Sequence, residues 1–142
     1  MSKWILVASL FSATVAQACP DLSGEYSQCR SQTGEAEVSR ESISQRSQDG
    51  TEVYSVSSDN LEPMEYVADG ETYSVDAPDS NLTYDTTATC EDDALEVDIV
   101  ARLAGFKVGS GHVTTRKNGN QLTQEIHFSS PAKSVDDTVT CE

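Results

Sequence analysis

The chain has 142 residues, enough for one domain, and it carries 24 Asp and Glu against 9 Lys and Arg, a formal net charge of −15 at pH 7. Such a surface repels phosphate backbones and anionic lipids. Nucleic acid is therefore excluded as a partner, and cationic proteins are favoured.

The N-terminal segment has the three parts of an export signal. Lys3 supplies a basic start, residues 4–11 are apolar, and Ala16-Gln17-Ala18 places small residues before a cleavage point. The apolar run is well short of the roughly 20 residues that a membrane-spanning helix needs. The pattern predicts a cleavable bacterial Sec-type signal peptide over 1–18 and an exported domain, periplasmic or secreted, over 19–142.

The exported domain would contain all four cysteines of the chain, Cys19, Cys29, Cys90 and Cys141. An even number in an exported chain predicts two disulfides, and the spacing does not choose among three pairings. Lipid attachment at Cys19 is the alternative, and a membrane partner is expected only in that case. No C-x₂-C pair is present, so a metal site at these cysteines is not predicted.

Along the domain, apolar and polar residues alternate with a period of two, and no amphipathic helix is indicated. Ser, Thr, Val and Tyr, which suit pleated strands, are frequent. Tight-turn dipeptides predict four hairpins. The expected turns are at Asp49-Gly50, Asp69-Gly70, Asp92-Asp93 and Asn118-Gly119. A first strand over 22–29 and a last strand over 135–141 bring the total to about ten.

Each hairpin predicts which residues lie opposite one another on the paired strands. The expected partners are Ile43 with Val56, Gln45 with Tyr54, Tyr66 with Tyr73, Met64 with Val75, Cys90 with Leu95, and Val113 with Gln124. In the fourth hairpin this register places Leu122, Ile126 and Phe128 on one dry face, as a sheet with one buried side requires. The fold class expected is all-β, an antiparallel up-and-down meander. A closed barrel is the expected architecture, because closure pairs the edge strands that a ten-stranded sheet would otherwise leave unpaired. A two-sheet sandwich is the alternative.

The segment Gly24-Glu25-Tyr26, followed by a strand meander, resembles the lipocalin-like (calycin) barrels, whose first strand carries Gly-x-Trp. The resemblance is to a small exported bacterial member and implies a ligand cavity inside the barrel. Six side chains expected to face inward are the candidate ligand-binding residues: Tyr54, Tyr66, Tyr73, Tyr84, Ile126 and Phe128. The same residues also fit a packed core in which the tyrosine hydroxyls find partners at the rim.

Catalytic chemistry is not predicted. His112 and His127 are expected on the polar face of the fourth hairpin, with Glu125 opposite His112, where a cross-strand contact is ordinary. No nucleophile elbow, zinc-protease motif or phosphate-binding loop is present. The acidic clusters at 91–93 and 76–79 lack the spacing of a calcium loop. We therefore expect a non-enzymatic protein without cofactor or metal.

Two functions remain after these exclusions. The first is a monomeric binding protein that carries a small apolar or amphipathic ligand. The alternative is an acidic interaction or inhibitor protein directed at a basic periplasmic or extracellular partner, to which the strongly negative surface would be attracted. The sequence identifies neither ligand nor partner.

Overall fold

The computed structural model describes residues 18–59, 61–78 and 80–142. The expected signal peptide lies outside the described residues, apart from Ala18. These ranges form strands and loops only, so they hold no helix that could cross a membrane. The strands are β1 (Gly24–Tyr26), β2 (Cys29–Ser31), β3 (Glu41–Gln48), β4 (Thr51–Ser58), β5 (Leu61–Val67), β6 (Thr72–Asp76), β7 (Leu82–Glu91), β8 (Ala94–Leu103), β9 (Phe106–Asn118), β10 (Gln121–Ser129) and β11 (Ser134–Cys141).

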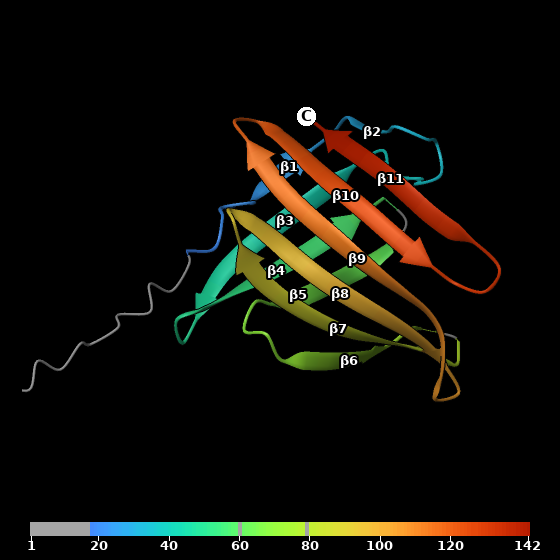
Figure 1. Ribbon diagram of the computed structural model, residues 1–142. Coiled ribbons are helices and arrows are strands. Elements are labelled where there is room, and N and C mark those ends of the chain that lie inside the picture. Colours follow the sequence, from blue (N-terminus) through green and yellow to red (C-terminus); the bar gives the residue numbers. More distant parts are fainter. Residues whose placement is uncertain (1–17, 60, 79) are drawn as a thin grey trace, which may run out of the picture.

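The strands form two antiparallel sheets that lie one behind the other in Figure 1. The smaller sheet has the order β1-β3-β4-β5, and the larger has the order β2-β11-β10-β9-β8-β7-β6. Within the described residues no strand pairing joins the two sheets, so they do not close into a barrel. The predicted all-β antiparallel class is confirmed, and the architecture corresponds to the two-sheet alternative.

The sheets separate where the chain passes from β5 to β6, and the hairpin predicted at Asp69-Gly70 is wrong. Its ends bond to different sheets, because Ala68 N–H donates to Glu52 O while Gly70 N–H donates to Ala88 O. The expected partners are therefore apart. Tyr66 pairs with Tyr54 and Met64 with Val56 in the small sheet, whereas Tyr73 pairs with Thr86 and Val75 with Tyr84 in the large sheet.

Two of the predicted hairpins have the expected register. Ile43 is opposite Val56 across the turn at Asp49-Gly50, and Cys90 is opposite Leu95 across the turn at Asp92-Asp93. In both turns the two central residues have positive φ, which matches the right-handed twist of the flanking strands.

The register predicted at Asn118-Gly119 is wrong by one position in the turn. Gly119, with φ of 63°, is the first central residue of the turn, and Asn118 is already paired with Gln121. Glycine at the first central position is typical of a type II′ turn, whereas a two-residue Asn-Gly loop typically forms a type I′ turn. Val113 is therefore opposite Ile126 and not Gln124. The faces are unchanged, because each partner moves by two residues.

The single first strand expected over 22–29 is two short strands that belong to different sheets. β1 pairs with β3, and β2 pairs with β11. The chain crosses between the sheets at Ser27 and Gln28, whose N–H groups donate to the carbonyl of Glu142. The first and last segments of the domain are thereby bonded to each other.

The core lies between the sheets and is concentrated near the ends of β7 and β11. The buried side chains of this cluster come from both sheets and from the segment before β1: Leu22, Tyr26, Ile43, Tyr54, Ala88, Leu95, Val97, Leu122, Val139 and Cys141. Both disulfides lie at this end, Cys19–Cys90 and Cys29–Cys141. The predicted pair of disulfides is thus present. The two disulfides indicate an oxidising, non-cytoplasmic environment. The Cys19–Cys90 bridge uses the sulfur atom to which a lipid on Cys19 would be attached.

Candidate functional site

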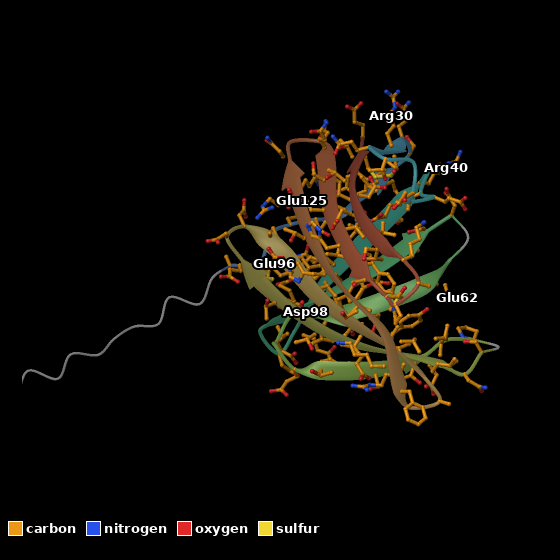
Figure 2. All side chains as sticks on the ribbon, turned by 45° about the vertical axis from the view of Figure 1, so that its right-hand side comes forward. Arg30, Arg40, Glu62, Glu96, Asp98 and Glu125 are labelled. Carbon is orange, nitrogen blue, oxygen red and sulfur yellow. A yellow bond between two sulfur atoms is a disulfide. The ribbon has the colours of Figure 1, made fainter. Side chains whose placement is uncertain are left out.

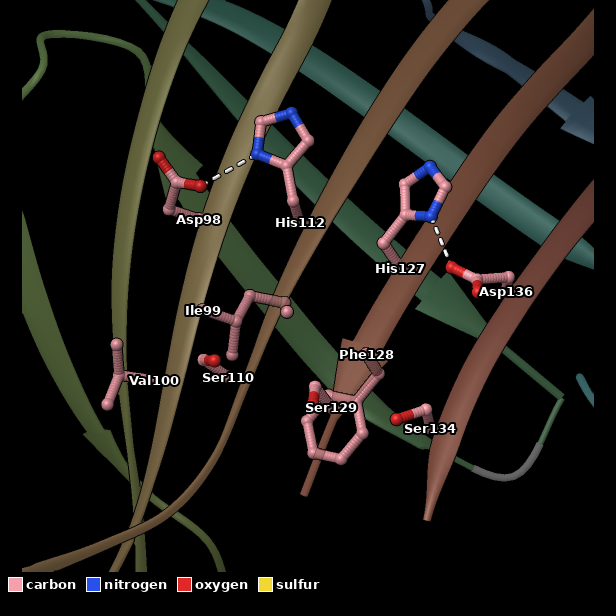
Figure 3. A pocket seen from close by; sticks show the side chains of 11 residues that line it. Asp98, Ile99, Val100, Ser110, His112, His127, Phe128, Ser129, Ser134 and Asp136 are labelled. Carbon is pink, nitrogen blue, oxygen red and sulfur yellow. Dashed lines mark hydrogen bonds and ion pairs between the residues drawn. The ribbon is translucent and has the colours of Figure 1, made fainter. Parts of the chain in front are cut away.

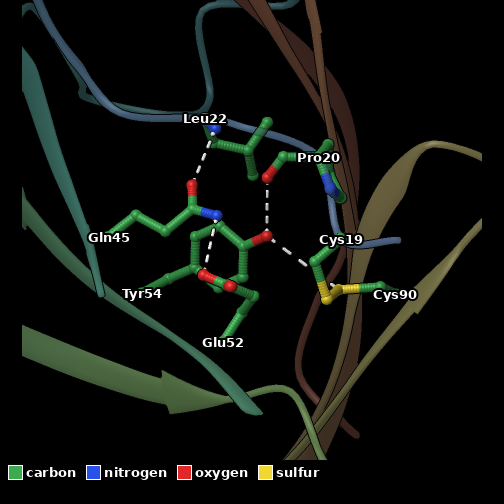
Figure 4. The surroundings of a disulfide bond; sticks show 7 residues. All are labelled: Cys19, Pro20, Leu22, Gln45, Glu52, Tyr54 and Cys90. Carbon is green, nitrogen blue, oxygen red and sulfur yellow. Dashed lines mark hydrogen bonds between the residues drawn. A yellow bond between two sulfur atoms is a disulfide. The ribbon is translucent and has the colours of Figure 1, made fainter. Parts of the chain in front are cut away.

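The six candidate ligand-binding residues occupy four different environments. Tyr54 is fully buried beside the Cys19–Cys90 disulfide, and its hydroxyl donates to Pro20 O at 2.7 Å, as Figure 4 shows. Tyr73 is 41% exposed, and its hydroxyl donates to Asp69. The first is a core residue with a satisfied hydroxyl, and the second is a surface residue. Neither faces a cavity.

Tyr84 and Phe128 are half-buried on the inner face of the large sheet. Phe128 packs on two glycines: a Cβ placed on Gly109 would lie only 2.7 Å from the Phe128 ring, and one on Gly111 would lie 3.0 Å from it. The ring fills the space that larger side chains on β9 would occupy. Phe128 packs on β9 and also lines an open groove, described below, but it does not line the cavity between the sheets.

Tyr66 and Ile126 both line a cavity of about 160 Å³ between the sheets. The remaining walls come from both sheets and from the loop before β3. The lining side chains are Val38, Glu41, Ile43, Val56, Ser58, Tyr66, Leu95, Val113, Thr115, Gln124 and Ile126. Aliphatic groups predominate, with polar groups gathered around Glu41.

Glu41 is the unexpected member of this cavity, because it is only 4% exposed. Its Oε1 accepts a hydrogen bond from Gln124 Nε2 at 2.7 Å. Burial raises the pKa of this carboxyl to about 7, although the hydrogen bond from Gln124 acts in the opposite direction. Of the described residues that line the cavity, none is Lys, Arg or His, so the carboxylate has no cation within the cavity wall.

Tyr66 is electrostatically linked to this carboxyl. Burial raises the pKa of the phenol to about 12, and the negative charge of Glu41 adds to the increase. The phenol is therefore neutral at every physiological pH. Tyr66 therefore brings no charge to the cavity wall, and its hydroxyl donates to Met64 Sδ at 3.7 Å.

A buried aspartate holds the loop that forms one wall of the cavity. Asp137 on β11 is 5% exposed, and its carboxylate accepts hydrogen bonds from the Ser31 hydroxyl and from the N–H groups of Thr33 (3.1 Å) and Ala36 (3.0 Å). These donors, the Ser31 hydroxyl above all, hold the pKa of the Asp137 carboxyl well below its usual range. The loop fixed in this way leads to Val38, which lines the cavity.

The outer face of the large sheet carries the two histidines. They are direct cross-strand partners, so the prediction that Glu125 lies opposite His112 is wrong, as the corrected turn requires. His112 bonds Asp98 at 2.7 Å through Nδ1 and Glu96 at 2.6 Å through Nε2, and His127 bonds Asp136 at 2.5 Å. Figure 3 shows the His112–Asp98 and His127–Asp136 contacts.

His112 and His127, with their bonded partners Glu96, Asp98 and Asp136, form a row that borders an open groove of about 580 Å³. The acidic residues near the histidines, Glu96, Asp98 and Glu125, are labelled on the strands of the large sheet in Figure 2. The carboxylates of Asp98 and Glu96 accept hydrogen bonds from the His112 ring and raise the pKa of His112, Asp98 most strongly, while burial opposes the rise. No group of three or more His, Cys, Asp or Glu suited to a metal ion occurs in the part of the chain that the structure describes. The row is a cross-strand hydrogen-bond network.

Sequence reasoning missed Glu41, although the sequence contains a signal for it. In a strand, residues i and i+2 share a face, so a strand that buries Ile43 also directs Glu41 toward the core. The alternation therefore placed an acidic residue at a dry position. The cavity itself was not predictable, because Gln124 lies 83 positions further along the chain.

Comparison with known proteins adds no relative to this description. No protein-family model matches the chain, and no curated protein matches it. The function is therefore argued from the geometry alone.

Proposed function

We propose that the protein is an exported binding protein that takes a small amphipathic ligand into the cavity between its two sheets. The observation that supports the proposal most strongly is Glu41, a carboxyl at the wall of an otherwise largely aliphatic cavity. Ligand sites in proteins are typically apolar with a few convergent polar groups. Glu41 and Gln124, which are hydrogen-bonded to each other, supply such groups in the cavity wall.

The cavity limits the size of the ligand. Its volume of about 160 Å³ is close to that of an engineered cavity of roughly 150 Å³ that binds benzene. A ligand on the order of ten non-hydrogen atoms fits this space. Its apolar part would contact Ile43, Val56 and Ile126, which are aliphatic and lie on both sheets.

The carboxyl favours a ligand with a protonated amine. An ion pair in a water-poor cavity is strong when its remaining hydrogen bonds are satisfied, and Gln124 already satisfies one oxygen of Glu41. Amine binding would keep the carboxyl ionised, so affinity should rise as the pH passes from 5 to 8. A neutral ligand of the same shape would show the opposite trend or none.

The test has two parts. Native mass spectrometry of protein purified from its own host should show a co-purifying small mass. Titration with benzylamine and with toluene, followed by NMR shifts of methyl groups on Ile43, Val56 and Ile126, should show saturable binding of the amine. In Glu41→Gln the amine should bind at least tenfold more weakly while toluene binding changes by less than about twofold.

Glu25→Gln is the matched control, because Glu25 is an exposed carboxylate on β1, next to β3. It should leave both titrations unchanged. Equal amine binding by the wild type and Glu41→Gln, or methyl shifts confined to the outer face, would overturn the proposal.

A further inference from the structure

The four edge strands of the two sheets differ in how they are protected. β1 and β2 have three residues each, too short to template a further strand. β5 carries Pro63, and its Glu65 forms an ion pair with Arg46. Charged and proline residues are the usual means of protecting an edge. These three edges are thus blocked or too short.

β6 has less protection, because its one charged residue, Asp76, is at its C-terminal end. Its five residues, Thr72–Asp76, are all exposed, and it pairs on one side only, with β7. It carries neither proline nor lysine, and Figure 1 shows it at the margin of the molecule. β6 therefore offers an open row of backbone donors and acceptors.

An apolar surface adjoins this edge. Tyr73 and Val75 lie on the same face of the large sheet as Leu103 and Phe106, as the strand registers from β6 to β9 require. It is the face that packs against the small sheet elsewhere, yet these four side chains are 41%, 42%, 46% and 77% exposed. Exposed apolar groups on one face beside a free edge are typical of an interaction surface.

The charge around the edge is of one sign. Residues 68–78 contain Asp69, Glu71 and Asp76 and no Lys or Arg. The whole chain carries a formal net charge of −15, so a second copy of the same chain would be repelled. A cationic chain would be attracted both locally and over a longer distance.

We propose that β6 receives an extended, positively charged segment of a partner protein as an additional strand of the large sheet. The backbone of β6 would provide the hydrogen bonds, as in other cases of strand addition. Alternate side chains of the segment would contact Tyr73 and Val75, and its Lys or Arg residues would lie near Glu71 and Asp76. This surface is separate from the cavity at Glu41 and does not depend on it.

The probe is a capped heptapeptide, Lys-Val-Lys-Tyr-Lys-Val-Lys, with a control peptide in which the central Tyr is Pro and strand pairing is blocked. Hydrogen exchange read by NMR should show slowed amides within 72–76 on addition of the first peptide only. Its affinity, measured by fluorescence anisotropy, should fall as salt is raised from 20 to 300 mM.

Two variants distinguish apolar contact from electrostatic attraction as the source of the peptide's affinity. Val75→Lys places a charge on the apolar face of β6, and Thr72→Lys makes the same change of charge on the opposite face of the same strand. Both positions are exposed, so both variants should fold with unchanged melting temperature. We expect Val75→Lys to weaken peptide binding about tenfold or more, and Thr72→Lys by less than about threefold.

Three results would overturn the proposal. One is equal weakening by the two variants, which would mean that charge alone attracts the peptide. Another is protection of amides on β5 in place of β6. The third is a concentration-dependent dimer, detected by analytical ultracentrifugation and abolished by Val75→Lys, which would make a second copy the occupant of this edge.

Discussion

The two ends of the large sheet are built in opposite ways. At one end, Leu122, Val139 and Cys141 are fully buried, and both disulfides join this end to the N-terminal segment. At the other end, the turn between β8 and β9 exposes Leu103 and Phe106. The same inner face is thus covered at the first end and uncovered at the second. We therefore expect the free energy of unfolding to depend mainly on side chains and disulfides at the closed end.

Removal of a disulfide at the closed end should have the largest effect. The bridge Cys29–Cys141 spans 112 residues, and loss of so long a covalent loop costs about 4–5 kcal/mol of the free energy of unfolding. We expect this loss in the double variant Cys29→Ala, Cys141→Ala, measured by urea denaturation. A loss below 1 kcal/mol would mean that the closed end is not where the stability is concentrated.

A pair of leucine truncations compares the two ends directly. Leu122 is 0% exposed and Leu103 is 46% exposed, although both lie on the inner face. We expect Leu122→Ala to lower the free energy of unfolding by about 2–5 kcal/mol, because it leaves a cavity in the core. Leu103→Ala should lower it by less than about 1 kcal/mol. Equal losses in chemical denaturation would contradict the distinction between a closed and an open end.

Substitution of Glu41 should have the next largest effect on the free energy of unfolding, and the size of this effect depends on pH. The pKa of the carboxyl is about 7 in the folded state against an ordinary value of 4.5, so the folded state binds the proton more tightly. The cost of the buried charge is absent below pH 4.5, grows between pH 4.5 and 7, and is complete above 7. Glu41→Gln should therefore stabilise the protein at pH 8, by at most about 3 kcal/mol, and leave it unchanged at pH 4. Thermal unfolding of both proteins across this pH range is the measurement.

The histidine row on the outer face should give the smallest effect. The pKa of His112 is raised above its ordinary 6.5, so its favourable contribution is complete below pH 6.5 and is lost as the pH rises through the folded-state pKa. His112→Gln should lower stability at pH 5.5 by less than about 1 kcal/mol, because the side chain is 41% exposed, and it should have no effect at pH 9. A larger loss at pH 9 than at pH 5.5 would contradict this assignment.

Sequence reasoning succeeded where structure depends on neighbours in the chain. The pairing of Ile43 with Val56 follows from a period of two and a local turn. The placement of Leu122 and Ile126 toward the core follows in the same way, even though the turn beside them was shifted. Because side chains alternate between the two faces of a strand, a shift of two residues in the cross-strand partner leaves each side chain on the predicted face.

It failed where the chain changes sheets. Nothing local distinguishes Asp69-Gly70, which crosses between the sheets, from Asp49-Gly50, which closes a hairpin. The difference comes from bonds to distant strands, such as Gly70 N–H to Ala88 O. The same crossings prevent a barrel, and they put Tyr66 and Tyr73, expected to be neighbours, in different sheets.

The order of the cysteines along the chain has a consequence for biogenesis. A polypeptide is synthesised from its N terminus, so Cys19 and Cys29 are made together, long before Cys141 at the end of β11. During that interval Cys90 can react with either early thiol, and only one of the two reactions gives a native bridge. Vectorial synthesis thus favours transient mispairing. A thiol–disulfide isomerase should accelerate maturation of this protein more than an oxidant alone.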